Sequence, residues 1–79
     1  MRIDLFLKES RIIKRRTIAK EYCERGLVLI NEKVAKPSSE VKSGDIVNIR
    51  FGEKRFDLVA TVEKVGKKER ASYEELKSK

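Results

Sequence analysis

Basic side chains crowd the first third of the chain, where together they could bind an anionic partner. Eight of the first 25 residues are Lys or Arg, against four acids. The densest run is Lys14, Arg15 and Arg16, which leads into a helix-forming segment. Cations at a helix start are unfavourable by about a few tenths of a kcal/mol each, but free backbone N–H groups and basic side chains there attract phosphate. We interpret the run as a phosphate site; the alternative is a solvated loop.

Further cations fall at spacings that would join them to this run. Arg16 and Lys20 stand four residues apart, so they project together from one helix face. Arg2 and Asp4 could form a local pair that orients Arg2; the alternative is an ordinary surface pair worth less than about 1 kcal/mol. The candidate RNA-binding residues are Arg2, Arg11, Lys14, Arg15, Arg16, Lys20 and Lys36.

The overall charge agrees with a polyanionic partner. The chain has 20 Lys and Arg against 13 Asp and Glu, a formal net charge of +7 and a pI near 9.8. The charged fraction of 42% is also typical of soluble proteins from hot environments, but that origin explains the density of charge and not its sign. Composition therefore favours nucleic acid.

The chain lacks the side chains that most catalytic chemistry needs. Histidine is absent, which excludes histidine-dependent acid–base and nucleophilic catalysis. The acids Asp4, Asp45 and Asp57 lie in separate segments and form no paired site, and no Gly-rich phosphate loop is present. We expect a protein that is not an enzyme and uses no cofactor and no metal.

The only cysteine, Cys23, excludes an internal disulfide and a multi-cysteine metal site and is expected in the core. Tyr22 and Phe51 could stack on bases, but core packing is the better interpretation because aromatic content is low. No run approaches the about 18 apolar residues of a membrane span, and Asp4 interrupts what would be the apolar run of a signal peptide. We expect a cytoplasmic protein, complete from residue 1 and not membrane-bound.

Apolar spacing predicts two helices at the N-terminal end. In residues 2–10, and again from about residue 15, apolar side chains recur at i, i+3 and i+4. Gly26 stands where a left-handed residue commonly ends a helix. The buried faces should be Ile3, Phe6 and Leu7 in the first helix and Ala19, Tyr22 and Cys23 in the second, with Ile18 beside them.

From Leu27 the apolar period changes to two, which predicts strands. A strand at 27–31 should reverse through a tight turn into Val34, and strands at 45–51 and 55–62 should form a hairpin through the loop GEKR. Asn31 suits a turn residue with positive φ, although Glu32 occupies the place where glycine is easiest. We therefore expect a slightly strained or different first hairpin.

The C-terminal end is expected to form no strand but a docked or frayed tail, in which Tyr73 and Leu76 could rest on the sheet. Residues 66–70 read as a mobile basic connector, and Ser72 with Glu75 forms a capping-box pattern for a short helix or docked tail. The predicted organisation is an α+β fold of two N-terminal helices packed on a small antiparallel sheet. It comprises a domain at 1–65 and a connector with a short helix or tail at 66–79, and it is expected to be monomeric.

The motif series in residues 2–51 resembles the alpha-L RNA-binding domain, known from a small-subunit ribosomal protein, tyrosyl-tRNA synthetases and pseudouridine synthases. Two departures occur: Arg15 replaces the Ser that caps the second helix in many members, and Glu32 replaces a Gly after the turn Asn. The matching residues are Arg2 with Asp4, Arg16 to Ala19, Gly26, Asn31, Lys36 to Ser38, and Gly44 with Asp45.

Within this family, the stand-alone length, KRRTIAK and the FG-x-K continuation most resemble the RqcP group of bacterial ribosome-quality-control factors. The resemblance weakens after about Val65. It implies binding to large ribosomal subunits stalled with peptidyl-tRNA, contacts with large-subunit rRNA and tRNA, and retention of the P-site tRNA. It also implies support of C-terminal alanine tailing by a partner of the RqcH/NEMF family. Arg2 and Arg16 match the family arginines expected to grip rRNA.

Other functions remain open from the sequence. A heat-shock-type relative would recycle free large subunits with nascent chains, without a tailing partner. The chain could also be the targeting domain of a pseudouridine synthase, a generic structured-RNA module, or a DNA-binding or protein-interaction module. Binding to ribosomal subunits in competition with duplex DNA separates the last from a ribosome-quality-control factor.

Overall fold

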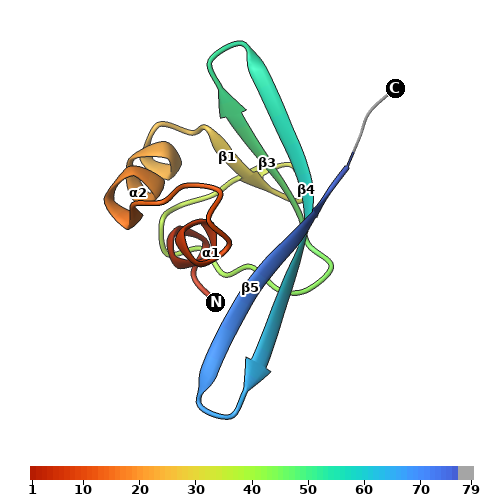
Figure 1. Cartoon of the computed structure of the whole chain (residues 1–79). Coiled ribbons are helices and arrows are strands. Elements are labelled where there is room, and N and C mark those ends of the chain that lie inside the picture. The colour runs from red at the N-terminus through yellow and green to blue at the C-terminus, as the bar shows by residue number, and fades with distance from the viewer. Residues whose placement is uncertain (77–79) are drawn as a thin grey trace.

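Two short helices cover one face of an antiparallel sheet (Figure 1). The computed structural model describes residues 1–76, and the α+β prediction is confirmed. The five strands lie in the order β2-β1-β3-β4-β5, and every neighbouring pair is antiparallel. The elements are α1 (Ile3–Glu9), α2 (Arg16–Glu24), β1 (Val28–Ile30), β2 (Lys33–Val34), β3 (Ile46–Phe51), β4 (Lys54–Val65) and β5 (Lys68–Glu75).

The helices pack through the faces that the apolar spacing predicted. Ile3, Phe6 and Leu7 of α1 are fully buried, and so is Ala19 of α2. Ile18 is exposed, so it does not belong to the buried face. The predicted core residues Tyr22 and Phe51 are in contact, with ring centroids 5.6 Å apart. In the described chain, no helix is long and apolar enough to cross a membrane.

The β1–β2 hairpin has the turn that Asn31 predicted. Ile30 pairs with Lys33, so the turn consists of two residues, Asn31 and Glu32. Their φ angles are 50° and 70°, as a type I′ turn requires. The side chain of Asn31 also accepts the N–H of Ile46 at 3.0 Å. The turn is therefore tied to the start of β3, and Glu32 adopts a conformation that favours glycine.

The β3–β4 hairpin is tighter than the predicted loop GEKR. Phe51 pairs with Lys54, which leaves Gly52 and Glu53 as the turn. Gly52 has a φ of 62°. Arg55, predicted as both the last residue of the loop and the first residue of the strand 55–62, belongs to β4 and lies opposite Arg50. The two arginines therefore face each other across the hairpin.

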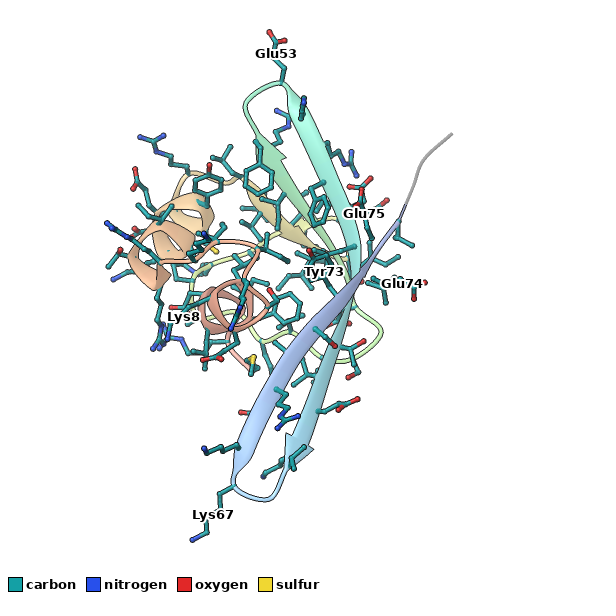
Figure 2. The ribbon with its side chains drawn as sticks, in the orientation of Figure 1. Lys8, Glu53, Lys67, Tyr73, Glu74 and Glu75 are labelled. Carbon is teal, nitrogen blue, oxygen red and sulfur yellow. The ribbon has the colours of Figure 1, made fainter. Side chains whose placement is uncertain are left out.

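The expected C-terminal helix is wrong for the residues that the structure describes. Lys68–Glu75 form β5, which pairs with β4, and the expected mobile connector 66–70 is the turn and first part of this strand. Tyr73 lies on the side of β5 that faces the helices (Figure 2), and its ring centroid is 5.6 Å from that of Phe56. A helix this short is not stable alone, so pairing with β4 and the contact of Tyr73 with Phe56 stabilise the strand instead. Residues 77–79 of the expected helix or tail lie outside the described residues.

Replacing Glu32 by glycine should stabilise the fold. Glycine adopts positive φ without a Cβ penalty, so Glu32→Gly is expected to raise the free energy of unfolding by about 0.5–1 kcal/mol. Urea unfolding followed by circular dichroism measures this value. The control is Glu53→Gly in the other turn, where φ is not positive, so added chain freedom should destabilise. A Glu32→Gly protein less stable than the parent would contradict the argument.

Candidate nucleic-acid interface

The carboxylate of Asp4 connects the two helices. Asp4 is 2% exposed. Its Oδ2 lies 3.2 Å from Nη2 of Arg2 and 3.4 Å from Nε of Arg16. Its Oδ1 accepts the N–H of Leu5 at 2.7 Å. The side chains of Arg2 and Arg16 remain 51% and 47% exposed. Asp4 therefore orients both guanidinium groups and leaves their other N–H groups facing solvent.

These residues form a shallow pocket at the start of α2, which we call the Asp4 site. It has a volume of about 260 Å³ and is lined by Arg2, Asp4, Arg16, Thr17 and Lys20. Three of the predicted RNA-binding residues thus come together around one carboxylate. The sequence predicted the Arg2–Asp4 pair but not the link to Arg16, which comes from twelve residues further along the chain.

The backbone at this end of α2 adds donors to the site. Residue 15 is the N-cap, and no side chain caps the helix. The N–H groups of Ile18 and Ala19 donate to the carbonyl of Arg15, so those of Arg16 and Thr17 have no acceptor within the helix. The first turn contains no acid. A phosphate would therefore meet free amides and arginine side chains together.

The cationic run divides between loop and helix. Arg16 is the first residue of α2, Arg15 is the extended N-cap, and Lys14 precedes it. Lys14 and Arg15 therefore belong to the loop, and Arg16 belongs to the helix. Both side chains are exposed.

Arg11 and Lys14 line a second basic pocket beside the end of α1. Its volume is about 350 Å³, and Lys8 and Glu9 complete its lining. Arg11 has a φ of 64°, in the left-handed region that disfavours side chains with a Cβ. A strained position that carries a cation rather than glycine is typical of a functional site. Lys8 was not among the predicted RNA-binding residues, and its i, i+3 spacing to Arg11 was the signal that could have indicated it.

Lys36 belongs to a turn that holds the start of α1. The carbonyl groups of Pro37 and Ser39 accept the N–H groups of Asp4 and Ile3 at 3.3 and 2.8 Å. Lys36 is exposed and lines neither basic pocket. Its turn nevertheless fixes the end of α1 that carries the Asp4 site.

Cys23 is a core residue, as predicted. Burial raises the pKa of its thiol to about 11, and the negative charges of Asp4 and Glu24 add to the effect. The thiol stays protonated at neutral pH and is a poor nucleophile. Among residues 1–76, no group of three or more potential ligands could hold a metal ion.

The helix pair, the small sheet and the fixed arginine pair define a small RNA-binding module. Residues 1–47 match the S4 domain, and the chain belongs to this family. The alpha-L resemblance, the fold that it implied and the resemblance to the RqcP group are confirmed.

Relatives and a solved structure agree with this family. The chain is 51% identical over 73 residues to the RQC P-site tRNA stabilizing factor of Halalkalibacterium halodurans, over 91% of this chain and 83% of that protein. It is 49% identical to the Bacillus subtilis factor of the same name, over 91% of this chain and 85% of that protein. The structure of Vibrio cholerae Heat Shock Protein 15, described as trimeric, matches with a TM-score of 0.77 at 29% identity, over 96% of this chain and 81% of that one.

Replacing Asp4 by asparagine should weaken RNA binding although it makes the protein more basic. The change removes the charge that orients Arg2 and Arg16, so we expect about a tenfold loss of affinity, the scale of one charge-assisted contact. Fluorescence anisotropy with labelled bulk tRNA measures it, and circular dichroism checks folding. Glu63→Gln, on the exposed part of β4, makes the same charge change away from the site. If Asp4→Asn binds as tightly as Glu63→Gln, the orienting role is wrong.

Proposed function

We propose that this chain is a non-catalytic factor of ribosome-associated quality control. It binds stalled large ribosomal subunits that carry peptidyl-tRNA, contacts large-subunit rRNA and tRNA, and keeps the tRNA in the P site. The names of the relatives at 51% and 49% identity support the process. The observation that carries the binding mode is the buried Asp4 carboxylate, which presents Arg2 and Arg16 outward.

The mechanism is geometric. Double-stranded RNA presents phosphates and 2′-hydroxyls rather than a readable major groove. Guanidinium groups held at one end of α2 recognise the spacing of phosphates, because their own positions are fixed by Asp4 and by the packing of the two helices. The RNA-binding residues are the seven candidates, with Arg2 and Arg16 at the centre and the exposed lysines around them.

The same proposal covers the partners. The factor supports C-terminal alanine tailing of the nascent chain together with a protein of the RqcH/NEMF family, and it acts in the cytoplasm as a monomer. Affinity purification of the tagged chain tests this proposal. Large subunits, peptidyl-tRNA and the tailing protein should be recovered together, and recovery of no ribosomal subunit would refute it.

A second candidate is a heat-shock-type factor that recycles free large subunits with nascent chains. The structural match to Vibrio cholerae Heat Shock Protein 15 favours this second function. The sequence identity to that protein is 29%, lower than the 51% identity to the quality-control relative, which favours the first function. Deleting the gene separates the two functions. Loss of alanine tails supports the first function, and unchanged tails with accumulated free subunits support the second.

Arg16→Ala should weaken binding to large subunits by about 1–3 kcal/mol, because it removes a charge-assisted contact from a defined RNA site. Co-sedimentation of the purified protein with large subunits measures the change. Lys67→Ala, at the tip of the β4–β5 hairpin (Figure 2), removes the same charge elsewhere and should have little effect. Equal binding of the two variants would count against the Asp4 site.

Binding should also weaken steeply with salt. Each phosphate neutralised by the protein releases counterions, so log K is expected to fall by about 0.7–0.9 per unit of log salt concentration for every such contact. A titration from low to physiological salt gives the slope, and Arg16→Ala should reduce it by about one contact. A flat response in the parent protein would mean that its basic face stays solvated in the complex.

A further inference from the structure

Two arginines on the sheet lie directly opposite each other. Arg50 of β3 pairs in register with Arg55 of β4. Like charges in this position destabilise a sheet. Among the described residues, Arg50 forms no ion pair. No carboxylate among the described residues therefore pairs with Arg50 to compensate for its repulsion by Arg55.

Arg55 is held in the same manner as Arg16. Its Nε lies 2.8 Å from Oδ1 of Asp57, and its side chain stays 62% exposed. Asp57 also accepts a hydrogen bond from the buried Asn48 at 2.5 Å. The hydrogen bonds from Arg55 and Asn48 hold the pKa of Asp57 below its usual value. The carboxylate thus stays charged, and the Nη groups of Arg55 remain available.

A third arginine completes a pocket around this pair, which we call the sheet pocket. Arg25, which follows α2, lines it together with Arg50 and Arg55, and the volume is about 360 Å³. Leu29 and Val34 contribute apolar surface, and none of its lining residues is an acid. Arg25 also pairs with Glu21 at 3.3 Å but remains 68% exposed. Three arginines therefore line a cavity that suits an anion with an apolar neighbour, such as a ribose.

The sheet pocket is separate from the Asp4 site. The two lie at opposite ends of α2, which spans nine residues, or about 13 Å at 1.5 Å per residue. Arg50 and Arg55 come from β3 and β4, whereas the Asp4 site is built only from the N-terminal helices and Arg2. A single phosphate cannot contact both groups.

We propose that the sheet pocket is a second RNA-backbone site, which holds a phosphodiester segment other than the one at the Asp4 site. The inference rests on the proposed function, which places the chain between rRNA and tRNA. An RNA backbone is favoured over an acidic protein because Asp57, which does not itself line the pocket, holds Arg55 as Asp4 holds Arg16. In each of these two pairs the aspartate binds Nε of the arginine. The two Nη groups remain free as a planar pair of donors whose geometry matches phosphate.

Arg50→Glu tests this inference because the two readouts should move in opposite directions. The variant places Glu opposite Arg55, so the midpoint of thermal unfolding should rise. Affinity for large subunits carrying P-site tRNA should fall about tenfold, the scale of one lost backbone contact plus repulsion. The matched control is Lys67→Glu, the same charge change at the tip of the β4–β5 hairpin (Figure 2). A loss for Arg50→Glu no larger than for Lys67→Glu overturns the proposal.

Further measurements separate this inference from the proposed function. The same variants are titrated with labelled bulk tRNA alone. If the parent protein binds no subunits, the proposed function fails. The tRNA titration still tests whether the sheet pocket binds RNA, because Arg50→Glu should then lose more affinity for tRNA than Lys67→Glu does. A labelled polyglutamate peptide is the last probe. If it binds the parent protein and loses affinity in Arg50→Glu more than tRNA does, the pocket recognises an acidic protein and the RNA assignment is overturned.

Discussion

The buried charge of Asp4 is the constraint that joins folding to RNA binding in this chain. A carboxylate that is 2% exposed is costly unless cations and hydrogen bonds compensate for lost hydration. Asp4 lies on α1 beside the fully buried Ile3, so it cannot turn away without breaking the core. Arg2 and Arg16 must therefore converge on it from two directions. Core packing therefore fixes the positions of their outward N–H groups, so the candidate binding face is as rigid as the helix pair.

Three places where the sequence breaks local rules coincide with the candidate sites. Helix α2 begins with an arginine and has neither a capping side chain nor an acid in its first turn. Arg11 adopts positive φ beside one basic pocket, and Arg50 opposes Arg55 beside another. Each feature lowers the stability of the free protein, and a bound phosphate would offset the missing cap at α2 and the repulsion between Arg50 and Arg55. Such conflicts are expected where function rather than folding selects the residue.

Features that depend on residues close together in the sequence could be predicted. Features that depend on strand pairing and contacts between distant segments could not. The helix faces and the positive φ of Asn31 follow from local spacing and turn chemistry. The strand β5 was missed because the Ser72–Glu75 capping pattern is local, whereas the contact of Tyr73 with Phe56 is not. The sheet pocket was missed for a related reason: a four-residue loop GEKR does not give the register that pairs Arg50 with Arg55, and only the two-residue turn at Gly52 and Glu53 sets them opposite each other.

The two candidate sites also show why net charge alone cannot describe this protein. A formal charge of +7 attracts RNA and sets the salt dependence of binding, and exposed lysines contribute to it as well as arginines do. The orientation of the bound RNA depends on arginine rather than lysine. A lysine ammonium that pairs with an aspartate has no second, rigidly placed set of donors for another anion. Arg16 and Arg55 give Nε to a carboxylate and keep both Nη groups for another anion. At the proposed sites the lysines would therefore supply attraction, while the arginines held by aspartates would determine where and in which orientation the RNA backbone lies.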